Sequence, residues 1–363
     1  MNHLKCYKYL VIFMGALFVS LPICSQAAQG IIIDHACTDI TKIPDSWINQ
    51  VKSSLKIHYA HTSHGEQPLE GFSRLMAANP KYNYYPDNCN VPITPEYMSL
   101  MDGQYYDSSC ETYISPDLFW EGELGLAMTR SVLNSFDVNI SMWAWCTQLN
   151  YYTQAEVQVY LNNMAQLESE YPGVTFVYMT GNAQSGDDEG QNRYDRNNQI
   201  REFCRQNNKI LFDFADLDCW YGGEQHTAAG IPTEHPHYNG DEAAHTTFES
   251  CENKARAFWW LLARIAGWDG VNVTPPTPPT LTVSTAGTTV TASWTTIAGA
   301  TGYTLFYAPY PYTGPETIVS VDMGTQTGIS ANLWKGASFY LAVQANNSAG
   351  SSGYSNIRDF VVN

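Results

Sequence analysis

The chain has 363 residues, of which 44% are hydrophobic and 15% charged, and its 35 acidic against 18 basic residues give a formal net charge of −17. This length allows more than one domain, and the apolar fraction is sufficient for a packed core. So acidic a chain repels phosphate backbones, and we therefore expect no nucleic-acid partner.

Residues 1–28 have the pattern of a secretory signal peptide. Lys5 and Lys8 give a positive start, an apolar run follows over Tyr9–Ile23, and small residues suited to cleavage occur at 25–27. The run is too short for a confident membrane span, and no later stretch is apolar enough for one. Removal of Lys5 and Lys8 with the signal peptide leaves 16 basic and 35 acidic residues, a formal net charge of −19. We expect a secreted, periplasmic or cell-surface protein whose mature chain has no membrane span.

Residues 29–272 alternate strand and helix patterns. Four β-rich segments are expected as strands: 55–60, 138–143, 174–179 and 209–214. Thr153 and Glu156 form a capping box before one helix, and residues 193–207 and 253–265 are expected as two more. This alternation predicts a three-layer α/β/α domain with a parallel sheet. Residues 80–117 interrupt the pattern, and we interpret them as a long insertion near the site.

A linker and an all-β domain follow. The run Thr274–Thr280 is rich in proline, and we take residues 273–280 as a semi-rigid linker. In residues 281–363, segments with alternating polarity at 281–283, 290–294, 303–307 and 339–343 predict short strands. With Trp294 in an early strand and Asn347–Gly350 in a late turn, this region resembles a fibronectin type III domain, an immunoglobulin-like sandwich.

Seven cysteines follow the leader, so at least one thiol is expected to stay unpaired. Because export permits disulfides, we expect two that close polar loops, Cys89–Cys110 and Cys219–Cys251. Cys146 and Cys204 lie in apolar segments and are expected as buried thiols.

In an open parallel sheet, ligands bind beyond the carboxyl ends of the strands. The expected strands of the front domain are followed there by hydroxyl, imidazole, amide and carboxylate side chains, and side chains of the same kinds precede the last expected helix. The segments are His61–Gly65, Trp145–Gln148, Thr180–Ala183, Asp216–Asp218 and Asp241–His245.

With these segments the front domain resembles the SGNH/GDSL hydrolases, which share the flavodoxin-like fold. The resemblance implies Ser63 as the nucleophile, although the family's Gly-Asp-Ser is His-Thr-Ser here. It implies His245 as the base, oriented by an acid three residues earlier in the chain. Glu242 has that spacing and Asp241 lies beside it, so the acid stays open between the two.

The resemblance also implies donors for the oxyanion of an acyl-transfer reaction. Gly125 is the candidate glycine, and Gln148 and Asn182 are alternative candidates for the side-chain amide. His61 and His64 flank the expected nucleophile and are expected to shape its pocket. No cofactor and no metal are expected.

The function expected is that of a serine esterase which removes acyl groups from polysaccharides or related extracellular substrates. Two alternatives stay open. The front domain could be a non-catalytic glycan-binding or surface protein with a degenerate hydrolase fold. It could instead be a metal-dependent hydrolase that uses the pairs His61/His64 and His235/His237.

Overall fold

The computed structural model describes residues 30–184, 186–270, 275–347 and 349–363. The predicted signal peptide, and residues 273 and 274 of the predicted linker, lie outside these ranges. Residues 275–280 are irregular, and the first strand of the tail starts at Leu281. Within the described residues, no helix combines the length and the apolar character needed to cross a bilayer.

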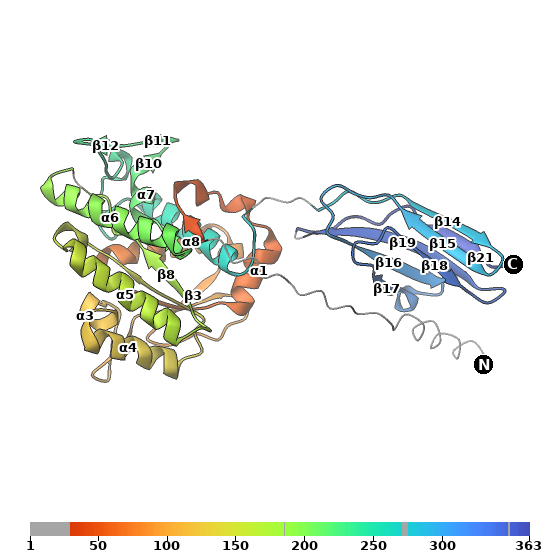
Figure 1. Cartoon of the computed structure of the whole chain (residues 1–363), viewed down its shortest axis with the longest axis horizontal. Helices are drawn as coiled ribbons and strands as arrows, with labels where there is room; N and C mark the ends of the chain where they lie inside the picture. Colours follow the sequence, from red (N-terminus) through yellow and green to blue (C-terminus); the bar gives the residue numbers. More distant parts are fainter. Residues whose placement is uncertain (1–29, 185, 271–274, 348) are drawn as a thin grey trace.

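The front domain contains a parallel seven-stranded sheet (Figure 1). Its spatial order is β1 (Ile32–Ile33), β9 (Ile210–Phe212), β8 (Thr175–Met179), β7 (Ile140–Ala144), β2 (Lys56–His61), β4 (Met98–Asp102) and β3 (Tyr84–Asn88). Within it β4, β2, β7, β8 and β9 have the order 2-1-3-4-5, which is the flavodoxin-like doubly wound order. The four strands expected from the sequence are present, displaced by one or two residues.

Helices cover both faces of this sheet, so the predicted α/β/α layering is confirmed. Neighbouring side chains of β2 point to opposite faces: the Tyr59 ring meets Phe258 of α8, whereas the His58 ring stacks on Phe119 of α3. Helices α1, α2 and α8 pack together, and α4, α5 and α6 pack in series. Their bounds are α1 Asp45–Ser54, α2 Glu66–Ala78, α3 Pro116–Phe119, α4 Gly122–Ser135, α5 Gln154–Glu170, α6 Asp188–Gln206, α7 Phe214–Cys219 and α8 Phe248–Ile265.

Local sequence explains where these helices begin. The capping box of Thr153 and Glu156 is confirmed at the start of α5. Helices α6 and α8 begin five residues earlier than expected, because Asp187 and Thr247 cap them with their side-chain oxygens.

The interpretation of residues 80–117 as an insertion was wrong in part, because two of its segments are strands of the main sheet. β4 is buried along its whole length, and the edge strand β3 contains Pro86, which an edge tolerates. The remainder includes the hairpin of β5 (Gln104–Tyr106) and β6 (Ser109–Glu111). The expected disulfide Cys89–Cys110 is present and joins this hairpin to the end of β3.

The second expected disulfide, Cys219–Cys251, was wrong, since both cysteines are free and buried. The Cys219 thiol donates to the carbonyl oxygen of Ala215 in its own helix. Cys251 lies in α8, where α2 approaches so closely that a Cβ on Gly71 would meet its carbonyl oxygen at 2.1 Å. Cys146 and Cys204 are buried thiols, as expected.

The tail is a sandwich of two antiparallel sheets around its own core, which includes Trp294, Tyr303 and Val343. One sheet contains β14 (Leu281–Ala286), β15 (Thr289–Trp294) and β18 (Gly328–Asn332). The other contains β17 (Val319–Asp322), β16 (Gly302–Pro309), β19 (Ser338–Asn347), β20 (Gly350–Ser351) and β21 (Arg358–Val361). Short hairpins in the front domain complete the strands: β10 (Trp220–Tyr221), β11 (Glu224–Gln225), β12 (Thr227–Ala228) and β13 (Ile231–Pro232).

Candidate functional site

The strand order places a crevice at the carboxyl ends of β2 and β7. Within the sheet, the strands β3 and β4, which follow β2 in the chain, lie to one side of β2. The later strand β7 lies next to β2 on its other side. Such a reversal of strand order is where doubly wound sheets bind ligands. β2 leads into the short helix η4 (Ser63–Gly65), and β7 leads into Cys146 and the short helix η6 (Gln148–Asn150). The predicted nucleophile Ser63 therefore lies at the reversal point.

The nearest polar partner of the Ser63 hydroxyl is a thiol. Ser63 Oγ lies 3.0 Å from Cys146 Sγ, and His64 Nδ1 lies 2.9 Å from the same sulfur. Among the hydrogen bonds of the described residues, none joins Ser63 to His245. The ring of His245 is instead 5.1 Å from that of His64, centroid to centroid.

The environment of Cys146 favours its thiolate. Burial acts to raise the pKa of this thiol, but the hydrogen bond and the positive charge of His64, with the hydrogen bond of Ser63, outweigh that effect. The pKa falls from 9.0 to about 6. The other four free thiols have pKa values raised by burial, so Cys146 is distinct among the described free cysteines.

Both candidate amide side chains bind backbone groups of Cys146. Gln148 Oε1 accepts a hydrogen bond of 2.6 Å from the Cys146 amide, and its Nε2 faces Thr62 Oγ1 at 3.4 Å. Asn182 Nδ2 donates to the Cys146 carbonyl oxygen at 3.4 Å, while its own buried Oδ1 has no partner. Gln148 thus links the loop after β7, through Cys146, to the loop after β2, through Thr62. Its side-chain Nε2 lies next to the segment that contains Ser63.

His245 is exposed and lies in a strained turn before α8. Ala244 and His245 both have positive φ values, 47° and 70°, in the left-handed region that side chains disfavour. Gln67 of α2 holds this turn by donating to the Ala244 carbonyl oxygen at 2.7 Å. Unfavourable backbone of this kind is frequent at functional sites.

The structure does not bring either expected acid into contact with His245. The Glu242 carboxylate accepts a hydrogen bond from the Phe248 amide at 2.8 Å and so caps α8. Asp241 is exposed. The helix dipole stabilises a carboxylate at the start of a helix. Because Glu242 serves this structural purpose, its spacing from His245 alone does not identify it as the acid that orients the imidazole.

Gly125 is also misplaced for the expected role of oxyanion donor. It lies inside α4, where a Cβ would come within 3.0 Å of the Asp117 carbonyl oxygen. Its lack of a side chain therefore allows α4 to pack on the turn of α3.

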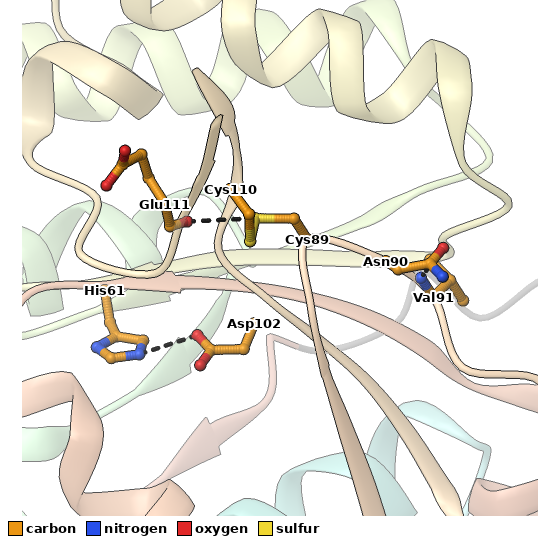
Figure 2. The surroundings of a disulfide bond; sticks show 7 residues. All are labelled: His61, Cys89, Asn90, Val91, Asp102, Cys110 and Glu111. Atoms are coloured by element: carbon orange, nitrogen blue, oxygen red, sulfur yellow. Dashed lines mark hydrogen bonds and ion pairs between the residues drawn. A yellow bond between two sulfur atoms is a disulfide. The ribbon is translucent and has the colours of Figure 1, made fainter. Parts of the chain in front are cut away.

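A buried ion pair forms at the other side of Ser63. His61 Nε2 is 3.0 Å from Asp102 Oδ1, and its Nδ1 is 3.0 Å from the Thr62 carbonyl oxygen. Both ring nitrogens lie within hydrogen-bonding distance of an oxygen atom, an arrangement that favours the protonated ring. Burial acts to lower the pKa of His61, but the bond and charge of Asp102 prevail and raise it. Figure 2 shows His61 pointing toward Asp102, close to the Cys89–Cys110 disulfide.

Ser63 and His61 line a surface pocket of about 280 Å³. The other lining residues are Glu66, Thr112, Tyr113 and Ala244, so the pocket reaches from the end of β2 to the His245 turn. The site is therefore open to solvent on the side of Ser63, whereas Cys146 behind it is only 7% exposed.

A different group could hold a cation among the residues that the structure describes. Asp34, His35 and Asp216 bring their ligand atoms within 4.8 Å of one another, next to the ends of β1 and β9. The pairs His61/His64 and His235/His237 contribute to no such group within the described ranges. The His35 ring already pairs with the Asp216 carboxylate at 2.5 Å and stacks on Trp220, which explains the cluster without an ion.

Three features of the site were absent from the sequence interpretation. Cys146 was expected only as a buried thiol, Asp102 lay within the supposed insertion, and Asp218 was given no role although its segment was named. Asp218 instead forms a buried ion pair of 2.7 Å with Lys254 of α8. The position of Cys146 in the sequence could have indicated a functional role, because it comes shortly after β7, a strand beside the reversal point.

No protein-family model matches the chain, and no curated protein matches it. Solved structures do match over about a quarter of the chain. The FN1–FN3 domains of chicken CNTN1 match at 22% identity and a TM-score of 0.22, over 24% of this chain and 31% of that one. The fibronectin type III domain of human collagen alpha-1(XX) chain matches at 24% identity and a TM-score of 0.22, over 25% and 88%.

A third match is the domain from human fibronectin type III domain containing protein 3, at 22% identity and a TM-score of 0.21, over 25% of this chain and 88% of that one. The chain spans about a third of the CNTN1 fragment, which holds several domains. The antiparallel sandwich of residues 281–363 is a fibronectin type III-like region, as the strand pattern predicted. These similarities concern fold and carry no statement about activity.

Proposed function

We propose that the front domain is a serine hydrolase of the SGNH type which cleaves acyl esters. The observation that carries the proposal is the position of the Ser63 hydroxyl. It lines an open pocket at the reversal point of a doubly wound sheet, between the His61 imidazole, which is paired with Asp102, and Cys146, whose environment favours the thiolate. A hydroxyl with these neighbours can attack a carbonyl carbon while its proton is accepted nearby.

Two kinds of donor can stabilise the oxyanion of the tetrahedral intermediate. The backbone N–H of Ser63 begins the short helix η4, and the Nε2 of Gln148 is held toward the same segment. His61 lines the wall of the pocket, and its pKa is raised by Asp102; in its protonated form it would lower the energy of a negative charge developing beside Ser63. Water then attacks the acyl-enzyme and releases the acid.

Acylated polysaccharides are the substrate class that we propose. Tyr113 lines the pocket and is 58% exposed, and Tyr151 next to the Cys146 loop is 67% exposed. Exposed aromatic rings beside a nucleophile can stack on the apolar faces of sugar rings. The predicted export signal and the fibronectin type III-like tail are consistent with an extracellular substrate, by analogy of architecture.

The test compares hydrolysis of p-nitrophenyl acetate and of acetylated xylan by the wild type and by Ser63→Ala. We expect the variant to lose at least about 10³-fold in kcat/KM, because the nucleophile acts as a unit with its activating groups. Ser53→Ala, an exposed serine near the end of α1, is the matched control and should keep full activity. Equal rates for wild type and Ser63→Ala would remove Ser63 from the mechanism.

One observation favours a second candidate, a non-catalytic glycan-binding module. Ser63 and His245 are not hydrogen-bonded, although the resemblance implies that they should be. In that case the wild type should bind acetylated xylan without turnover. Tyr113→Ala should then weaken binding, and Ser63→Ala should leave it unchanged.

A further inference from the structure

We propose that Cys146, held by His64, is the catalytic residue that accepts the proton of Ser63. The inference deepens the proposed function and rests on it, since Ser63 must be the nucleophile. It replaces the imidazole of the expected base with a thiolate at the end of β7.

The first step is the pairing of thiol and imidazole. His64 is 3% exposed, and its Nδ1 contacts Cys146 Sγ at 2.9 Å, while its Nε2 is buried without a hydrogen-bond partner. In the resting state the Cys146 thiol has released its proton to solvent, and the Nδ1–H of His64 donates a hydrogen bond to the thiolate, whose remaining lone pairs can accept from a second donor. The Ser63 hydroxyl, 3.0 Å from the sulfur, is in place to be that donor.

The second step is the fixation of the sulfur. Gln148 and Asn182 bind the amide N–H and the carbonyl oxygen of Cys146, so the backbone on both sides of its Cα is held by side chains of the rim. These are the two amides for which the family resemblance suggested oxyanion duty. A catalytic group needs such support, because small displacements cost large factors in rate.

The proton transfers balance. When the Ser63 oxygen bonds to the carbonyl carbon, the Ser63 O–H proton passes to the Cys146 sulfur and the carbonyl π electrons move to its oxygen. When the intermediate collapses, the bond to the leaving alcohol breaks and the thiol proton passes to its oxygen. Water repeats both transfers in deacylation. His64 keeps its proton throughout and acts as a positioning residue.

The experiment measures how fast a fluorophosphonate probe labels Ser63 between pH 5 and pH 9, with the site identified by peptide mass spectrometry. Wild type should label, with a rate that rises as the thiol ionises. Cys146→Ala should label about 10²–10⁴-fold more slowly, the usual contribution of a general base. The matched control Cys204→Ala, a buried thiol in α6, should label at the wild-type rate.

The His245→Asn variant distinguishes this proposal from the imidazole base of the family. It should label within a few-fold of wild type and keep the pH profile. Because folding defects lower every rate, circular dichroism and the shape of the pH profile are compared for each variant. The titratable groups that face the pair, directly or through His64, are His245, Tyr151 and Glu234.

Two results overturn the proposal while the hydrolase stands: Cys146→Ala labels at Ser63 as fast as wild type, or it keeps the wild-type pH profile. Loss of labelling in His245→Asn with retention in Cys146→Ala would also overturn it and restore the imidazole base. If the wild type does not label at Ser63 under any condition, the proposed function fails first, and this inference fails with it.

Discussion

The ionisation of Cys146 should be visible in the stability of the protein as a function of pH. The pKa of this thiol is about 6 in the folded chain and 9.0 in the reference state, so folding favours the thiolate. A depressed pKa contributes stability that is complete above pH 9 and is lost as the pH falls through 6. At 1.36 kcal/mol per pKa unit, the full contribution is about 4 kcal/mol, and roughly 1.4 kcal/mol of it remains at pH 7.

The perturbation that isolates this contribution is Cys146→Ser, which removes the titration and keeps a similar volume. Urea unfolding of wild type and variant at pH 5, 7 and 9 should give a stability difference that grows with pH. Cys204→Ser is the matched control, because burial raises the pKa of that thiol and leaves it neutral over this range. The thiolate absorbance near 240 nm, taken as wild type minus variant, should have its midpoint near pH 6.

A pH-independent difference between wild type and Cys146→Ser, together with a thiolate midpoint near pH 9, would show that folding does not favour the Cys146 thiolate. It would mean that His64 does not hold the thiol as the contact of 2.9 Å implies. The crevice would then contain an ordinary buried cysteine, and the Ser63 hydroxyl would need another partner.

Three further predictions concern stability. Lys254→Met should lower the free energy of unfolding by about 3–5 kcal/mol in urea, because Asp218 stays buried without its partner, and adding Asp218→Leu should restore much of the loss. Replacing both Cys89 and Cys110 by serine should cost about 3 kcal/mol, from the 21-residue separation that the disulfide closes, seen as a lower Tm without reductant. Trp294→Ala should destabilise the tail by about 3–5 kcal/mol in calorimetry and leave the esterase rate unchanged, because that side chain lies in the tail's own core.

The main strands of the front domain could be predicted because they are long runs of β-formers that end in polar residues. β2 and β7 follow this pattern, and the candidate site lies at their carboxyl ends. β3 and β4 could not be recognised, because each has only five residues and neither shows a clear alternation. β3 reads Tyr-Tyr-Pro-Asp-Asn and β4 reads Met-Ser-Leu-Met-Asp. Asp102, the partner of His61, was missed for the same reason.

The contacts of the site could not be predicted from spacing alone. Which side chain after β2 meets β7 depends on the tight turn of η4, where a Cβ on Gly65 would come within 2.2 Å of the His61 Cβ. That turn directs both Ser63 and His64 toward Cys146, which lies 83 and 82 residues further along the chain. Glu242 is the converse case. It has the chain spacing from His245 that the resemblance implies for the acid, but its carboxylate caps α8.

The most direct test of the account is the position of the acyl group during turnover. The wild type is quenched in acid during hydrolysis of a slow p-nitrophenyl ester and digested, and its peptides are mapped by mass spectrometry. Nucleophilic catalysis by Ser63 predicts an acyl ester on Ser63 that is absent from Ser63→Ala. A thioester on Cys146, recognised by rapid cleavage with neutral hydroxylamine, would contradict the account, as would hydrolysis with no acylated peptide.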